Sequence, residues 1–391
     1  MKKNKALVFA SVFTLLSTPS VWSSEIYKIS PDRFVSALRG FSKEAVEIED
    51  SIPQLGVVIV KQSLNKNTAG WSHLGSSQII KIEKPVAVAP KKLWGLKSLQ
   101  IEEAWVQTLG EGVVVAVSDT GIDSDHPDLL ENMWVNPREV INDIDDDGNG
   151  YVDDIHGWDF VKNKGSGVDH HYHGTHVAGT IGAKIGDKMA GVAPRVKLMD
   201  VSFLDAGGSG SDVNGAKTII YAADSGAKII NCSWGAPERV PLIEEAVLYA
   251  QKKGVLVVAA AGNAKTNTDK KPHTPSSLDP ENIISVGSIA SVKGTKSDFS
   301  NYGQKTVDLA GPGSNIYSTA PSSKTARYQT LSGTSMASPH AAGVAALVWS
   351  KYPNMDWKQV KAKVMSSAVP NKSWTTRSVS GGLLNAAQAV R

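Results

Sequence analysis

Ser335 stands in the segment Leu331-Ser-Gly-Thr-Ser-Met-Ala-Ser-Pro-His340, where a glycine turn precedes the apolar helical run from Ala341 to Trp349. The first N–H groups of a helix have no intrahelical partner, and the helix dipole places partial positive charge beside them. Such a position would stabilise the oxyanion that forms when a serine hydroxyl attacks a carbonyl. Because serine also caps helices without any catalytic role, Ser335 predicts a nucleophile only together with a base and an acid elsewhere.

Two upstream residues, an aspartate and a histidine, stand in contexts that suit these roles. Asp119 follows the apolar run 112–117, and a carboxylate at the end of a buried strand can orient an imidazole. Taken alone, it could also be an ordinary turn aspartate. His173 opens the segment His173-Gly-Thr-His-Val-Ala-Gly-Thr180, whose small residues allow close helix packing and leave the first imidazole facing a cleft. His176 lies one turn deeper and is interpreted as a core histidine.

Asn263 and the order of the residues along the chain narrow the choice of chemistry. Asn263 ends the apolar run that starts at Val257, and its side-chain amide could donate to an oxyanion together with the Ser335 N–H. The order Asp119, His173, Ser335 matches one known order of a catalytic triad. A lipase-like esterase would need an acid and then a histidine after the serine, and a chymotrypsin-like enzyme would need a histidine before the acid. Neither order fits this chain.

The elements that must position these residues alternate along the chain from residue 93 onward. Near-continuous apolar runs are typical of strands that are buried on both faces of a parallel sheet. Helical patterns lie between these runs, which predicts an α/β fold with a doubly wound, mainly parallel sheet. Chemistry in such folds gathers at the carboxyl ends of the strands. The predicted strands are 112–117, 196–201, 227–231, 254–260 and 282–286, and the predicted helices are 176–183, 213–225, 242–253 and 341–351.

The composition excludes several classes of protein. With 41% hydrophobic and 20% charged residues in 391, the chain is typical of a globular protein. Its 41 basic and 38 acidic residues leave a net charge of only +3 and form no basic stripe, so nucleic acid is not expected as a partner. Cys232 is the single cysteine, interpreted as a small buried hydrophobe, so intramolecular disulfides are excluded.

The N-terminus has the pattern of an export signal. Met1 to Lys5 are basic and precede an apolar run, Ala6 to Leu16, that is too short to span a bilayer. We therefore predict a signal peptide over residues 1–23 and a protein secreted to the periplasm or the medium. No membrane anchor is expected once the signal is cleaved.

The residues that follow differ in character from the rest of the chain. Residues 24–90 contain a helical pattern at 31–38 and strand-like runs at 56–60 and 78–82, which predicts a small α+β domain. The stretch 84–92, with its prolines and lysines, is typical of an extended linker. The catalytic domain is predicted over residues 91–391.

Four of these segments together resemble the signatures of one family. Val117-Ser-Asp-Thr-Gly-Ile-Asp123, the segment that opens at His173, Ala260-Ala-Gly-Asn263 and Gly333-Thr-Ser-Met-Ala-Ser-Pro-His340 are similar to those of the subtilisin-like serine endopeptidases, or subtilases. The resemblance implies that Asp119, His173 and Ser335 form the triad and that Asn263 is the oxyanion donor. It also implies that residues 24–90 are a propeptide, a folding assistant and intramolecular inhibitor removed by self-cleavage within residues 87–93.

Protein and peptide substrates are expected to bind as an added extended strand beside two segments with few bulky side chains, 208–210 and 233–235. The exposed main chain of such segments can form hydrogen bonds with the substrate main chain. Similar segments of the family form the pocket for the residue before the cut, and Trp234 stands where many relatives carry leucine. We therefore predict broad specificity with a preference for apolar or aromatic residues. The expected substrate-binding residues are Gly208, Ser209, Gly210, Ser233, Trp234 and Gly235.

An acidic segment, residues 143–154, predicts a structural calcium site. Oxygen-bearing residues occupy positions 1, 3, 5, 7 and 12, with glycine at 6, which is the spacing of an EF-hand loop. A solvated acidic loop is the alternative. Zinc is not favoured for the histidines between 170 and 176, because the helical His-x-x-His pair lacks the glutamate and third ligand of zinc proteases. The expected calcium ligands are Asp143, Asp145, Asp147, Asn149, Tyr151 and Asp154.

The sequence as a whole therefore predicts a secreted, monomeric serine endopeptidase with a propeptide. A calcium-stabilised, non-catalytic binding protein on the same scaffold is the alternative, and it would carry a damaged triad or oxyanion hole. All four positions are intact in this chain.

Overall fold

The structure is a computed structural model that describes residues 25–29, 48–55, 57–60, 71–76, 79–81, 93–322 and 326–391. The predicted signal peptide, the helical pattern at 31–38 and the linker at 84–92 lie outside the described residues. Among the helices of the described ranges, none combines the length and the apolar character needed to cross a bilayer.

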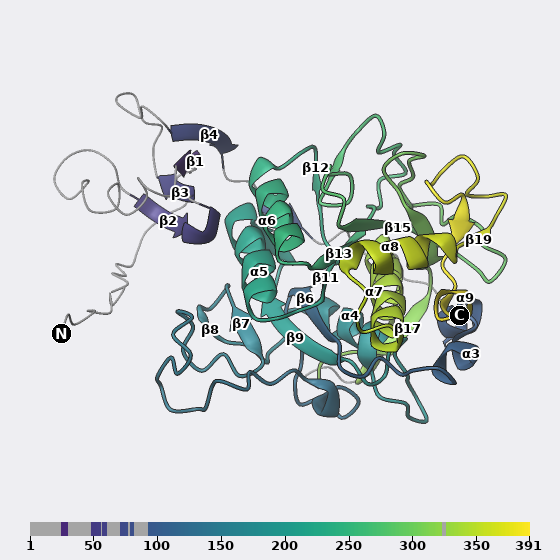
Figure 1. Cartoon of the computed structure of the whole chain (residues 1–391), viewed down its shortest axis with the longest axis horizontal. Helices are drawn as coiled ribbons and strands as arrows, with labels where there is room; N and C mark the ends of the chain where they lie inside the picture. The colour runs from purple at the N-terminus through teal and green to yellow at the C-terminus, as the bar shows by residue number, and fades with distance from the viewer. Residues whose placement is uncertain are drawn as a thin grey trace.

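A twisted sheet of ten described strands runs through the middle of the molecule (Figure 1). Its central strands are all parallel, and only the outermost pair at each edge is antiparallel. The strands, in order across the sheet, are β19 (Val369–Pro370), β20 (Gly382–Leu383), β16 (Leu309–Pro312), β15 (Ile283–Ile289), β13 (Leu256–Ala260), β11 (Ile229–Cys232), β6 (Val114–Asp119), β9 (Lys197–Ser202), β7 (Gly157–Asp159) and β8 (Lys164–Gly165).

Both faces of this sheet are covered, which explains why its strands are apolar throughout. Val115 and Val117 of β6 belong to one buried cluster, whereas Ala116, between them, belongs to the cluster on the other face. Side chains alternate across a strand, so each face needs its own layer of helices. The five strands expected from the sequence are β6, β9, β11, β13 and β15, and the doubly wound α/β prediction is confirmed.

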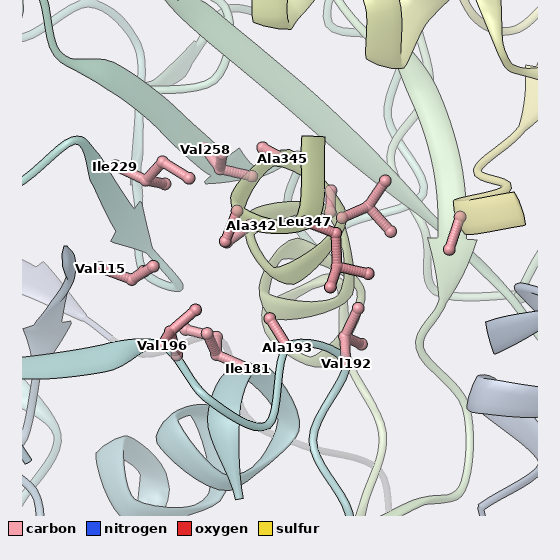
Figure 2. Close-up of a cluster of buried hydrophobic side chains, with 14 of the residues drawn as sticks. Val115, Ile181, Val192, Ala193, Val196, Ile229, Val258, Ala342, Ala345 and Leu347 are labelled. Atoms are coloured by element: carbon pink, nitrogen blue, oxygen red, sulfur yellow. The ribbon is translucent and has the colours of Figure 1, made fainter. Parts of the chain in front are cut away.

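The helices divide between the two faces. Helices α4 (His173–Gly182) and α7 (Thr334–Lys351) supply one cluster, and α5 (Asp212–Asp224) and α6 (Pro241–Lys252) supply the other. Figure 2 shows Ala342, Ala345 and Leu347 of α7 among Val115, Ile229 and Val258 of three strands. Shorter helices complete the part of the chain that holds the large sheet: α2 (Trp94–Ser98), α3 (Ile101–Trp105), η2 (Leu130–Asn132), α8 (Trp357–Ser366) and α9 (Ala386–Ala389).

Four strands near the N-terminus form a separate antiparallel sheet, in the order β2-β3-β1-β4. Figure 1 shows this sheet beside α5 and α6, and Ile52, Val57 and Ile59 share the buried cluster of these helices. Its elements are β1 (Glu25–Ile29), β2 (Ile48–Ile52), η1 (Pro53–Leu55), β3 (Val57–Val60) and β4 (Trp71–Ser76).

The next strand along the chain leaves that sheet. β5 (Ile79–Lys81) pairs antiparallel with β10 (Ser209–Ser211), with Ile80 opposite Gly210. It also lies close to β12 (Ala236–Pro237), so it runs between two segments of the catalytic part. The remaining strands are β14 (His273–Thr274), which pairs with β12, and the hairpin of β17 (Ile316–Thr319) and β18 (Tyr328–Leu331).

Candidate active site

The fold carries the four predicted catalytic positions to one edge of the sheet. Asp119 is the last residue of β6, and Asn263 follows the end of β13 by three positions. These strands are parallel and both pair with β11, so their carboxyl ends lie on the same edge. His173 is the first residue of α4, and Ser335 is the second residue of α7.

Asp119 and His173 form a fully buried pair. His173 Nδ1 lies 2.7 Å from Asp119 Oδ1, and both side chains have 0% exposure. The same oxygen accepts the Thr120 N–H at 2.8 Å. Because a carboxylate can only accept, Nδ1 is the protonated nitrogen of the neutral ring, and Nε2 is left as the base.

Asp169 joins the loops on either side of this pair, and sequence reasoning missed it. Its Oδ1 accepts the Thr120 hydroxyl at 2.8 Å, and its Oδ2 accepts the N–H and hydroxyl of Thr175 on α4 at 2.9 and 2.6 Å. Burial raises the pKa of this carboxyl. Thr120 follows Asp119 directly and Thr175 lies one residue past Gly174, so Asp169 fixes both halves of the Asp119–His173 pair.

Asp200, on β9, was also missed. Its Oδ2 accepts the N–H of Ile122, in the loop after β6, and that of Gly167, in the loop before α4, each at 3.0 Å. The side chain is fully buried, and desolvation raises the pKa well above the ordinary value. A single acid inside the near-continuous apolar run 196–201 was the signal that could have found it.

The start of α7 shows how Ser335 is held. The helix begins at Thr334, seven residues before the expected run at Ala341, and contains Pro339. Proline has no N–H to donate to the carbonyl four residues earlier, which is that of Ser335. The Ser233 hydroxyl donates to this carbonyl instead, at 2.8 Å. Because Pro339 leaves the Ser335 carbonyl available, the Ser233 hydroxyl can donate to it. This hydrogen bond ties the start of α7 to the end of β11.

Asn263 is oriented by the same turn. Its Oδ1 accepts the N–H and the hydroxyl of Thr334 at 2.9 and 3.0 Å. A Cβ built on Gly333 would lie 3.3 Å from Asn263 Nδ2 and 3.6 Å from the Ser335 nitrogen. Because Asn263 Oδ1 accepts from Thr334, Asn263 Nδ2 is left as the donor. It lies on the same side of Gly333 as the Ser335 N–H, as two donors to one oxyanion require.

Four polar atoms of this site are buried without a hydrogen-bond partner among the described residues: Asp119 Oδ2, Ser335 Oγ, His173 Nε2 and Asn263 Nδ2. Buried polar atoms normally have partners, and exceptions in a native structure call for an explanation. The last three are a hydroxyl, a base and an amide donor. Together they can remove a proton from a nucleophile and stabilise the negative charge that its attack creates.

The expected substrate-binding segments differ in what they present. Ser209 and Gly210 lie in β10, whose edge is paired with β5, and Gly208 precedes them in the left-handed region, at φ 68°. Trp234, in contrast, is fully buried. Its indole Nε1 donates to Ser118 Oγ at 3.1 Å, and its ring packs edge-on against Phe203, with 5.1 Å between centroids. The Trp234 side chain therefore fills part of the protein interior.

The acidic segment gathers only part of the expected ligand set. Carboxylate oxygens of Glu139, Asp145 and Asp147 lie within 4.8 Å of one another, and Glu139 was not expected. Asp154 instead accepts the Tyr221 hydroxyl at 2.5 Å and the Asn149 amide at 2.9 Å. The remaining expected residues are engaged through other groups: the N–H of Asp143 donates to Asp153, and the ring of Tyr151 packs against Trp158, Phe160 and Tyr221.

The neighbouring histidines point to different partners. His170 Nε2 lies 2.7 Å from Asp159 Oδ2, whereas His176 Nε2 lies 3.0 Å from the Ile316 carbonyl. His176 is fully buried, and desolvation lowers its pKa to about 3.

The family of the chain follows from comparison with known proteins. The model of the subtilase family matches residues 110–387, which include all four catalytic positions. The chain belongs to the subtilase family. It is therefore a serine endopeptidase.

Individual subtilases agree with this assignment. Thermitase from Thermoactinomyces vulgaris is 40% identical over 260 residues, 66% of this chain and 82% of thermitase. The major intracellular serine protease of Bacillus subtilis is 41% identical over 262 residues, 66% of this chain and 74% of that protease. The structure of fervidolysin from Fervidobacterium pennivorans, a keratinolytic enzyme related to subtilisin, matches 94% of this chain and 61% of its own at a TM-score of 0.72 and 27% identity.

Proposed function

We propose that this subtilase hydrolyses peptide bonds with Ser335 as the nucleophile. His173 Nε2 removes the hydroxyl proton as Oγ attacks the carbonyl carbon, and Asp119 holds the ring and stabilises its charge. Asn263 Nδ2 and the Ser335 N–H donate to the oxyanion. His173 then gives the proton to the leaving amine, and water hydrolyses the acyl-enzyme by the same route.

The observation that carries this proposal is the 2.7 Å Asp119–His173 bond beside three buried atoms that lack partners. A non-catalytic binding protein on this scaffold would have no need for such atoms, since each unsatisfied buried group costs about 1–3 kcal/mol. The geometry therefore favours the enzyme over that alternative.

We propose further that residues 24–90 are a propeptide that inhibits the enzyme. β5 adds a strand to β10, the segment expected to bind substrate, and it runs close to β12 on its other side. A substrate bound through its main chain would need the same edge. The four-stranded sheet packs on α5 and α6 through Ile52, Val57 and Ile59, which would keep β5 in place. Removal requires a cut between Lys81 and Leu93, a span that contains the expected interval 87–93.

Calcium is proposed as a structural ion. Glu139, Asp145 and Asp147 bring carboxylate oxygens within 4.8 Å, and calcium prefers such ligands. Three carboxylates this close repel one another, and only Asp147 has a basic partner, Arg138, among the described ion pairs of this cluster. A bound cation would remove the repulsion and secure the loop against local unfolding and autolysis.

The pattern of residues 1–23 supports export, and we propose a secreted, monomeric enzyme. The family does not fix the compartment, because an intracellular protease is among the relatives. Broad specificity remains part of the proposal. The expected preference for apolar or aromatic residues stays a prediction, and the burial of Trp234 gives it no support.

The test compares the wild-type precursor with Ser335→Ala. We expect the wild type to lose its N-terminal residues and to cleave casein, and the variant to stay full length and inert. Intact mass and a gel measure both. Ser338→Ala is the matched control, because Ser338 lies on the same helix and donates to Asn231. If Ser335→Ala processed itself, Ser335 would not be the nucleophile.

A further inference from the structure

The strands β11 and β13 separate just beyond the catalytic edge of the sheet. They are paired in parallel as far as Cys232 and Ala259. The segments that follow are 233–235, which ties to the start of α7, and 261–263, which ends at Asn263. A peptide whose carbonyl lies between Asn263 and Ser335 would then place the side chain before the cut between these two segments, a space that we call the crevice.

The imidazole of His273 fills the base of this crevice. A Cβ built on Gly235 would lie 2.1 Å from His273 Cε1, and one built on Gly262 would lie 2.9 Å from His273 Nε2. A side chain at Gly235 would therefore meet the ring, and one at Gly262 would meet both the ring and the amide of Asn301, at a backbone φ of +98°. His273 begins β14, which pairs with β12, so the backbone that carries the ring is held in place. Its exposure is 6%.

Hydrogen bonds fix which ring nitrogen faces the crevice. The His273 carbonyl accepts the Ser277 hydroxyl at 3.0 Å, so the Ser276 hydroxyl can donate to His273 Nδ1 at 3.1 Å. Nε2, the atom that meets the glycine walls, then carries the ring proton. A ring held in this way presents an N–H to a substrate oxygen.

The flanking charges are mostly positive. The loop that leads from Asn263 to His273 carries three exposed lysines, Lys265, Lys270 and Lys271. Its one acid, Asp269, accepts the N–H groups of residues 304–306. On the other wall Glu238 is exposed, and its backbone forms a bridge with His273.

We propose that His273 is the floor of the pocket for the residue before the cut and that it selects an acidic side chain, glutamate above all. The ring shortens the pocket, which disfavours aromatic residues, and Nε2–H with the lysines favours a carboxylate. This inference rests on the function proposed above and, for the residue before the cut, replaces the broad specificity proposed there. Between Lys81 and Leu93 the sequence has a single acidic residue, Glu83. The proposal therefore places self-cleavage after Glu83, with Lys84 as the mature N-terminus, outside the expected interval 87–93.

The test uses the mature enzyme and peptides that differ only at the residue before the cut: glutamate, glutamine, alanine or phenylalanine. We expect kcat/KM for glutamate to exceed that for glutamine by about tenfold or more, because a hydrogen bond to a charged group is worth more than one to a neutral group. Intact mass of the self-processed wild type should give Lys84 as the first residue.

Two variants separate the N–H of His273 from its volume. His273→Met keeps a side chain of similar size without an N–H donor, so it should lose the preference for glutamate over glutamine and still reject phenylalanine. His273→Gly should open the pocket and gain activity on phenylalanine. Labelling of Ser335 by a fluorophosphonate shows that each variant is folded and active.

The outcomes distinguish this inference from the function it rests on. A labelled, casein-cleaving wild type that prefers phenylalanine, or that treats glutamate and glutamine alike, would overturn the role of His273 and leave the protease intact. A wild type that takes no label and cleaves no substrate would overturn both.

Discussion

Carboxylates gather in two regions of this subtilase, and their bonds serve different parts of the molecule. At the catalytic edge Asp119, Asp169 and Asp200 accept from groups in the loops and the helix that carry the triad, mostly backbone N–H groups and threonine hydroxyls. In the acidic loop Glu139, Asp145 and Asp147 also accept backbone N–H groups, but these come from the loop itself, and the three carboxylates lie within 4.8 Å of one another. Carboxylates of the first kind fix geometry, whereas those of the second kind call for a cation. The first region should therefore govern turnover, and the second should govern stability alone.

The largest effect tests the catalytic side of this contrast. Asp119→Asn replaces an acceptor by an amide that can donate to His173 Nδ1, so the ring takes the wrong tautomer. We expect kcat to fall about 10⁴-fold with KM little changed. Steady-state kinetics on a peptide substrate, corrected by active-site titration, measures this. A fall of less than tenfold would show that Asp119 does not set the tautomer.

Asp169→Ala tests whether a carboxylate that does not touch substrate still governs turnover. The variant leaves the hydroxyls of Thr120 and Thr175 without their acceptor, and the loops that carry Asp119 and His173 can then shift. We expect kcat to fall about 10²-fold, the cost of a misplacement near 1 Å. The same titrated kinetics applies, and Asp169→Asn should recover part of the loss because it keeps one acceptor.

Removal of calcium tests the role of the acidic loop in stability. At a calcium concentration of about 100 times Kd the ion adds about 2.7 kcal/mol to the free energy of unfolding. We expect EDTA to lower Tm by several degrees in the inactive Ser335→Ala form, measured by calorimetry. The double variant Glu139→Gln, Asp147→Asn should lose the response.

Asp143→Asn is the matched control for the calcium experiment. It should keep the response, because Asp143 lies in the acidic segment but outside the cluster of Glu139, Asp145 and Asp147. If initial kcat of the wild type changed with EDTA while the enzyme stayed folded, the separation of turnover from stability would fail.

The smallest effect concerns pH and Asp200. Burial raises the pKa of the Asp200 carboxyl in the folded state well above 3.8, its ordinary value in the unfolded chain. Between these two pKa values the folded state binds a proton that the unfolded state does not. Stability of the wild type therefore falls as pH rises through that window. Asp200→Asn does not titrate, so its stability relative to the wild type should increase from pH 4 to pH 8. Denaturant unfolding in the Ser335→Ala background measures it, and a constant difference would contradict the raised pKa.

The sequence predicted the parts of this molecule that repeat a local pattern. β6, β9, β11, β13 and β15 are apolar on both faces, so each was visible as a run. The start of α7 was placed too late because Pro339 is a helix breaker in most contexts, and the Ser233 hydroxyl that compensates it comes from another strand.

Residues that act across the fold gave weaker signals. Asp169 and Asp200 bond to loops far away in sequence, and no spacing indicates such bonds. Tertiary contacts also give two expected site residues partners that the sequence did not indicate. Asp154, expected as a calcium ligand, accepts the hydroxyl of Tyr221 on α5. Trp234, expected to bind substrate, has its indole buried against Phe203.

Helix α7 has a consequence for how this enzyme ages. From Thr334 to Trp349 every residue of the helix is buried, and Ser335 is its second residue. A segment enclosed in this way cannot fray on its own, because it opens only when the whole core opens. Loss of activity in warm solution is then an all-or-none event for each molecule. Where autolysis is prevented, the working lifetime of a preparation would equal the waiting time for global unfolding, and the survivors would be fully competent.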